Sequence, residues 1–231
     1  MDSKSAESFP SKNASWTGTR NSTIELGQIV GDFATALQRA DAKRPQQAGR
    51  NGRMYSAGIG PHHEDKAVHM IVAEMRLLRP DAYDNAGPIH YPSNPRLTCD
   101  LAIGEGPEWA IEVKMARAYG DNGIPDASWL KDLISPYAVD RSALTDSAKL
   151  RASGFNTKGS HEAILIYGFD YDDRPLELAV DLLEHLLSRL GPTGPRKQAQ
   201  FSDLVHPIHQ RGSVVAWEIC WHGTNGKEET A

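Results

Sequence analysis

Residues 99 to 116 read CDLAIGEGPEWAIEVKMA, and this segment is the most informative about the fold. Two apolar runs flank a short segment rich in Gly and Pro, a pattern that predicts two antiparallel strands joined by a turn. Asp100 lies on the first run, and Glu112 and Lys114 lie on the second. Because side chains alternate along a strand, Glu112 and Lys114 share one face, and we expect that charged face to look outward while the apolar face packs.

The register of this hairpin follows from the length of its turn. If the turn is the five residues 104 to 108, Ile103 pairs with Trp109, and counting outward brings Asp100 opposite Glu112. Directly opposed residues have Cβ atoms about 4.5–5.5 Å apart, close enough for two carboxylates to share one cation. A slip of one residue, or a bulge, would turn Asp100 to the other face.

Two neighbouring carboxylates repel each other unless a cation neutralises them or one is protonated. Oxygen ligands favour Mg²⁺, for which Mn²⁺ can substitute, and the backbone carbonyl of Val113 is a further candidate ligand. Lys114 could then position an attacking water and stabilise charge that develops on a phosphate. The alternative is an ordinary exposed hairpin, whose acids and lysine only help solubility and strand pairing.

The pattern Asp100, eleven intervening residues, then Glu112-Val113-Lys114 resembles the PD-(D/E)XK nuclease superfamily. The Pro that usually precedes the Asp in that superfamily is Cys99 here. The resemblance implies an α/β, restriction endonuclease-like fold, with a central mixed sheet flanked by helices in the order αβββαβ. It also implies that Asp100 and Glu112 bind metal and that Lys114 is catalytic. The strand needed to complete that order is expected in GPIHY, residues 87 to 91.

In the superfamily a helix before the first motif strand carries an acid that completes the metal site. Residues 58 to 80 predict such a helix, since apolar residues recur at spacings of three and four and Pro80 ends the segment. Glu64 and Glu74 both compete for the role. Glu64 is preferred because its spacing from Gly60 resembles the start of this helix in several branches, and it would complete the site through water. Glu74 is interpreted as a solvated surface acid.

The rest of the chain is interpreted as one domain, residues 23 to 231, preceded by a mobile polar tail, residues 1 to 22. A first helix is expected to begin at Thr23. Further helices are expected at 129 to 134, 142 to 154 and 175 to 191, strands at 161 to 171 and 212 to 222, and a loop at 191 to 200.

Several basic residues are candidates for contact with nucleic acid. Arg50 and Arg53 belong to a basic segment rich in turn formers, and Arg117 closely follows the motif. Lys149 and Lys158 occupy places where related enzymes sometimes contact phosphate, although ordinary surface lysines are the alternative. The formal net charge of −5 disfavours indiscriminate tight binding to DNA. A locally basic, sequence-specific enzyme, or one recruited by a protein partner, fits this charge.

Other chemistries find less support in the sequence. His206 precedes His209 by three residues, but no Cys-x-x-Cys or HExxH pattern accompanies them, so zinc is not expected. Cys99 and Cys220 are interpreted as buried free thiols. No nucleophile elbow or phosphate-binding loop is present, and aromatic residues, at 7%, are too few for a sugar-binding cleft. The chain lacks both a membrane-spanning apolar run and a secretory signal, which predicts a cytoplasmic protein.

The sequence therefore predicts a Mg²⁺-dependent endonuclease that hydrolyses phosphodiester bonds of DNA, of prokaryotic defence or repair type. By resemblance alone, a homodimer is expected. The alternative is a nuclease-like fold that serves as a non-catalytic nucleic-acid-binding or assembly subunit. Whether the substrate is DNA or RNA, and whether it is duplex, branched or single-stranded, stays open, because a fold does not specify a substrate.

Overall fold

The structure is a computed structural model, and it describes residues 24–49, 52 and 54–219. The predicted tail, the predicted start at Thr23, Arg50, Arg53 and Cys220 therefore lie outside the described residues. The elements, in chain order, are α1 (Leu26–Ala42), α2 (Glu64–Leu78), α3 (Pro80–Tyr83), β1 (Gly87–Tyr91), β2 (Asn94–Ile103), β3 (Trp109–Ala116), α4 (Lys131–Ile134), η1 (Ala138–Asp140), α5 (Ala143–Arg151), η2 (Asn156–Lys158), β4 (His161–Phe169), α6 (Leu176–Leu190), β5 (Lys197–Phe201) and β6 (Gly212–Ile219).

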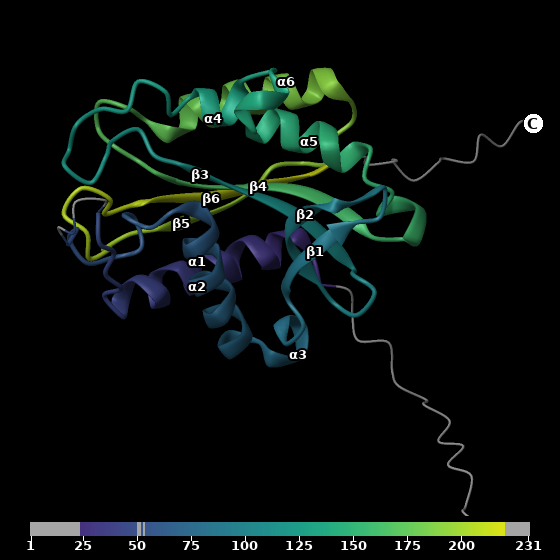
Figure 1. Ribbon diagram of the computed structural model, residues 1–231, viewed down its shortest axis with the longest axis horizontal. Helices are drawn as coiled ribbons and strands as arrows, with labels where there is room; N and C mark the ends of the chain where they lie inside the picture. Colours follow the sequence, from purple (N-terminus) through teal and green to yellow (C-terminus); the bar gives the residue numbers. More distant parts are fainter. Residues whose placement is uncertain (1–23, 50–51, 53, 220–231) are drawn as a thin grey trace, which may run out of the picture.

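A six-stranded mixed sheet in the order β1-β2-β3-β4-β6-β5 forms the centre of the fold. Strands β3 and β4 are parallel, and the other neighbours are antiparallel. Helices α1 and α2 cover one face, and α4, α5 and α6 cover the other, as Figure 1 shows. The protein is therefore α/β, and the elements α2, β1, β2, β3, α5 and β4 follow the expected order αβββαβ.

Burial on both faces explains the continuous apolar run of β4. Leu165 and Tyr167 belong to the core beneath α1 and α2, whereas Ile164 and Ile166 belong to the core beneath α5 and α6. A strand covered on one side only would need polar residues at every second position, and β4 has none in this run. The helices thus hold the middle of the sheet away from water on both sides, and they fix the ends of β3 where the charged residues lie.

Two sequence interpretations outside the hairpin were wrong. Within the expected loop 191 to 200, the structure has β5, which pairs with β6 as an edge strand. Its alternation of half-buried and exposed residues is that of a strand, but its polar composition hides this, because an edge strand needs little apolar surface. Glu74 is not a solvated acid: it is only 6% exposed and forms an ion pair with Lys43 of the segment after α1. The packing of α2 on α1 buries this carboxylate.

The hairpin has the register that its turn predicts. Ile103 pairs with Trp109, and Leu101 pairs with Ile111. The pairing of β2 with β3 ends at Leu101 and Ile111. The register between β1 and β2 shifts at this point, from Gly87 opposite Ala102 to Ile89 opposite Cys99. This irregularity places Cys99 and Leu101 in opposite cores, where regular alternation would have placed them together. Strands β2 and β3 therefore separate at Asp100.

Candidate active site

The separation of β2 from β3 leaves part of the β3 backbone facing a gap. The carbonyl of Glu108 accepts a hydrogen bond from the amide of His161 at the start of β4, so even-numbered residues of β3 direct their backbone groups toward β4. Odd-numbered residues face β2, which has no partner for them beyond Ile111. Buried amides need acceptors, and those of Val113 and Met115 must find them elsewhere.

Two carboxylates supply these acceptors. The amide of Val113 donates to Oδ2 of Asp100 at 2.9 Å, and the amide of Met115 donates to Oε2 of Glu64 at 2.6 Å. Glu64 is the first residue of α2, and its position at the helix start brings the carboxylate across the gap to β3. Of the two candidate glutamates on α2, Glu64 and Glu74, the structure brings Glu64 to the motif.

Lys114 lies between acids from two helices. Its Nζ is 3.2 Å from Oε1 of Glu64 and 2.9 Å from Oδ2 of Asp146 on α5. Burial alone would lower the pKa of Lys114, but the carboxylates of Glu64 and Asp146 outweigh it and raise the pKa above its usual value. Lys114 is therefore a fixed cation at neutral pH. It can stabilise negative charge, and it is a poor proton acceptor.

Glu112 is the most strongly perturbed acid of the group. Its side chain is buried, at 2% exposure, and burial together with the charge and hydrogen bond of Asp100 raises its pKa to about 9. The Tyr91 hydroxyl donates a hydrogen bond to Oε1 of Glu112, and Nζ of Lys149 lies 3.5 Å from the same oxygen. Asp100 and Glu112 therefore meet, as the hairpin register predicts.

The charged face of β3 does not look outward, which corrects the sequence interpretation. Helix α5 covers it, and Asp146 and Lys149 of α5 contact its side chains. Asp146 was missed, although the sequence holds a signal: it falls on the buried side of α5, three residues from Ala143 and four from Leu150. An acid on the apolar side of a helix needs a cation, and Lys114 and Lys149 provide it. Tyr91 had no comparable signal.

A hollow of about 350 Å³ opens beside the acids, between α2 and the start of β1. Glu64 and Asp100 form part of its wall, and Arg76 and the exposed His69 lie on the α2 side. It is lined by Glu64, Asp65, Val68, His69, Val72, Arg76, Gly87, Pro88 and Asp100. Arg76 also donates a hydrogen bond to the carbonyl of Ala86, and Glu112 and Lys114 are not among the residues that line the hollow.

The residues predicted to contact nucleic acid have different surroundings in the structure. Arg117 donates hydrogen bonds to the carbonyl of Gly60 and to Oδ1 of Asp121, so its guanidinium joins loops of the protein. Lys149 pairs with Asp146, at 2.5 Å, and with Glu112, so it belongs to the buried charge network. Lys158 lies in η2, and Arg50 and Arg53 lie outside the described residues.

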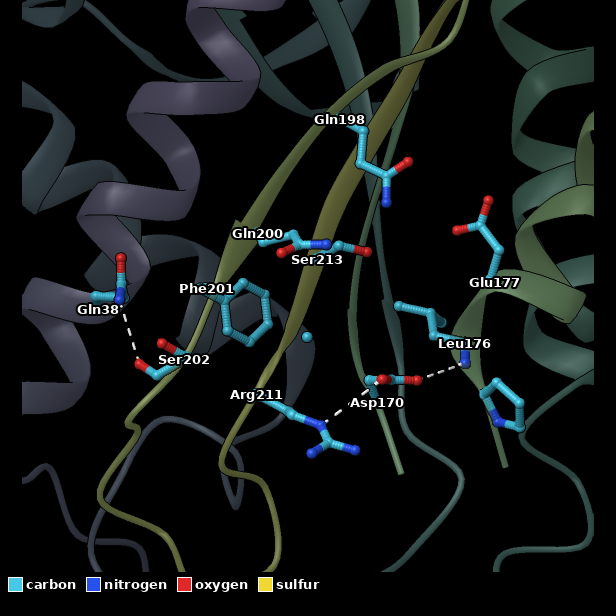
Figure 2. A pocket seen from close by; sticks show the side chains of 12 residues that line it. Gln38, Asp170, Leu176, Glu177, Gln198, Gln200, Phe201, Ser202, Arg211 and Ser213 are labelled. Atoms are coloured by element: carbon cyan, nitrogen blue, oxygen red, sulfur yellow. Dashed lines mark hydrogen bonds and ion pairs between the residues drawn. The ribbon is translucent and has the colours of Figure 1, made fainter. Parts of the chain in front are cut away.

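A second hollow, of about 380 Å³, lies among α1, β5, β6 and the start of α6 (Figure 2). Some of its polar groups contact one another. Asp170 accepts the amide of Leu176 at 2.9 Å and lies 3.7 Å from Arg211, and Gln38 donates to the carbonyl of Ser202. These contacts stabilise the end of the sheet, and they leave Asp170 and Arg211 engaged with the protein itself.

The donor set at the gap suits a hard divalent cation. Asp100 and Glu112 offer carboxylate oxygens. Burial, followed by the charge of Asp100, raises the pKa of Glu112, and a bound cation would favour the ionised carboxylate. Glu64, Asp100 and Glu112 are not one tight ligand group. Within residues 24–219, so far as they are described, the group of three whose ligand atoms all lie within 4.8 Å of one another is Asp121, His206 and His209. Glu64 could act only through water, as the resemblance implies.

Comparisons with known proteins identify no relative: no family model, no curated protein and no solved structure matches this chain. No helix in the described part of the chain is both long and apolar enough to cross a membrane.

Proposed function

We propose that the protein is a Mg²⁺-dependent nuclease that hydrolyses phosphodiester bonds of DNA. The observation that carries the proposal is the convergence of Glu64, Asp100, Glu112 and Lys114, from three separate segments, at the point where β2 and β3 separate. Surface charges on an ordinary hairpin would not be buried, would not bind free strand amides and would not gather an acid from a preceding helix. The order αβββαβ around them supports the same proposal.

The residues would divide the work as follows. Asp100 and Glu112, with the Val113 carbonyl, would hold Mg²⁺, which activates water and offsets charge on the phosphate when bound. Lys114 would stabilise charge that develops on the phosphate oxygens, since Glu64 and Asp146 keep it protonated. Asp146 would keep the ammonium aimed at the gap. The hollow beside Glu64 and Asp100 would receive the scissile phosphate.

The test is cleavage of supercoiled plasmid with Mg²⁺ or Mn²⁺, with chelator as the blank. We expect Asp100→Asn, Glu112→Gln and Lys114→Met to lose about 100-fold or more in rate, the scale seen when one charge-stabilising group is removed. Glu105→Gln, at an exposed acid of the same hairpin, and Lys66→Met, at an exposed lysine of α2, are the matched controls. Equal rates in wild type and in all three site variants would refute the proposal.

One observation favours the second candidate, a non-catalytic nucleic-acid-binding or assembly subunit. Lys149 and Tyr91 already engage Glu112, so the chain neutralises this carboxylate without a metal. Calorimetric titration with Mg²⁺ separates the two. A nuclease must bind the ion at Asp100 and Glu112, whereas an assembly subunit needs no ion there. Binding that Glu112→Gln abolishes would favour the nuclease.

A further inference from the structure

A second group of potential metal ligands lies outside the proposed active site. Asp121 follows β3, and His206 and His209 lie in the segment between β5 and β6. One ligand atom from each lies within 4.8 Å of the other two. The side chain of His209 is wholly buried, and that of Asp121 is 12% exposed. Two segments at the end of the sheet therefore direct two imidazoles and a carboxylate to one point.

The hydrogen bonds of His206 are incomplete. Nδ1 accepts long contacts from the amides of Ile208, at 3.2 Å, and His209, at 3.4 Å. Nε2 is buried and has no hydrogen-bond partner. The residue is 0% exposed, so water does not replace the missing partner at its surface. A buried ring nitrogen without a partner, beside a carboxylate and a second imidazole, is the arrangement that a metal ion would satisfy.

The surroundings of His209 and Asp121 resemble the outer contacts that orient metal ligands. Nδ1 of His209 lies 2.7 Å from the Tyr171 hydroxyl, and Nε2 lies 3.2 Å from Oδ1 of Asp121. With a metal on Nε2, the ring proton would sit on Nδ1 and be donated to Tyr171. Arg117 donates to the same Oδ1 of Asp121 at 3.1 Å and fixes the carboxylate.

The histidines are also in the form that binds metals. Burial, with the neighbouring His209, lowers the pKa of His206 to about 4, and burial lowers that of His209. Their rings stack, with centroids 4.6 Å apart and an angle of 15° between planes. Neutral imidazole is the metal-ligating state.

We propose that Asp121, His206 and His209 form a binding site for a divalent late transition metal, with Zn²⁺ as the ion that fits best. Two nitrogens and one carboxylate oxygen suit Zn²⁺ better than Mg²⁺, which prefers oxygen ligands. The ring proton of His206 would move from Nε2 to Nδ1, and the ring would turn from the two long amide contacts. The metal would join the segment after β3 to the segment before β6.

This site would also support the loop that leads into α2. A Cβ on Gly60 would come within 2.5 to 2.8 Å of the His209 ring, and one on Gly58 within 3.1 Å of His206. The loop 58 to 63 therefore packs directly on both histidines before Glu64 begins α2. A metal here would fix the base of that loop. The proposal itself does not depend on nuclease activity.

The experiment uses the full chain without a histidine tag, stripped of metal by chelation. Titration with Zn²⁺ against a chromophoric chelator should show one tightly bound Zn²⁺ ion per chain, and Zn²⁺ should raise the Tm. Co²⁺ should give the visible absorption of a site with nitrogen and oxygen ligands. Asp121→Asn and His209→Gln should lose at least about 100-fold in Zn²⁺ affinity, since even outer contacts cost 10- to 100-fold.

Two controls exclude other sites. His185→Ala, at an exposed histidine of α6, and the double variant Asp100→Asn with Glu112→Gln should keep the tightly bound Zn²⁺ ion. Zn²⁺ affinity in wild type no higher than in Asp121→Asn would overturn the proposal, as would loss of binding in the double variant alone. If His209→Gln fails to fold, the Zn²⁺ affinity of Asp121→Asn decides the test. Asn has the same shape as Asp and keeps an oxygen that can accept the hydrogen bond from Arg117.

Discussion

Replacing Glu112 with Gln should make the metal-free protein less sensitive to alkaline pH. The folded chain keeps a proton on Glu112 up to a pKa of about 9, whereas an unfolded glutamate loses it near its usual value of 4.5. The contribution of this proton to the free energy of unfolding is therefore complete below pH about 4.5, and it is lost as the pH rises toward 9. The cause is the burial of the carboxylate beside Asp100, and Gln has no charge to bury.

The magnitude follows from the pKa shift. One pKa unit corresponds to about 1.4 kcal/mol, so wild type should lose roughly 2 to 3 kcal/mol in free energy of unfolding between pH 6.5 and pH 8.5. For a chain of this size, this is a fall in Tm of roughly 5 to 10 °C. Glu112→Gln should lose less than half of that, because the variant has no carboxyl group at this position to titrate.

The assay is thermal unfolding in chelator at several pH values in this window. The effects of other titrating groups can be separated from that of Glu112 by the pH at which they occur. His206, with a lowered pKa, destabilises the protein only as the pH falls below about 6.5, and Cys99, with a raised pKa, contributes only above about pH 8.5. Mg²⁺ should raise the Tm of wild type more at pH 8.5 than at pH 6.5, because the ion competes with the proton. An equal pH dependence in wild type and variant would show that Glu112 does not hold the proton.

Three further predictions concern the fold around the site. Asp146→Asn should lower the free energy of unfolding by about 3 to 5 kcal/mol in urea titrations, because it leaves buried Lys114 with one acid fewer; exposed Asp181→Asn is the control. Ile111→Ala should cost about 2 to 5 kcal/mol in the same assay by opening a cavity, and a smaller loss would mean that the core closes around it. Gly212→Ala should abolish folding, seen by circular dichroism, because its Cβ would meet the Gly168 carbonyl oxygen at 1.9 Å; a folded variant would contradict this register.

Local patterns sufficed for part of this structure. The five-residue turn set the register of the hairpin as far as Leu101 and Ile111. Asp100 and Glu112 lie just beyond these paired residues, and their side chains interact. The strand GPIHY was found because the order of elements required it, and it is β1. Both inferences needed only neighbouring residues or a known order of elements.

The remaining features depend on contacts between distant segments. Nothing near Glu112 in the sequence indicates that α5 covers it, so its face seemed open to water. Glu74 resembled a surface acid because its partner, Lys43, lies 31 residues away. His206 and His209 are three residues apart, but Asp121 lies 85 residues before His206, so spacing in the sequence does not reveal the third member of the cluster. Burial by a distant helix is a property of the packed fold, and alternation along one strand does not reveal it.

The use of Asp100 and Glu64 as acceptors for the amides of Val113 and Met115 has a consequence for how such sequences are interpreted. These two acids take the place of the strand that has turned away, so the sheet needs them whether or not the protein cuts DNA. A descendant that had lost catalysis would still be selected to keep them. Glu112 and Lys114 bind no strand amide through their side chains in the described contacts, and their retention is the better sign of an active enzyme.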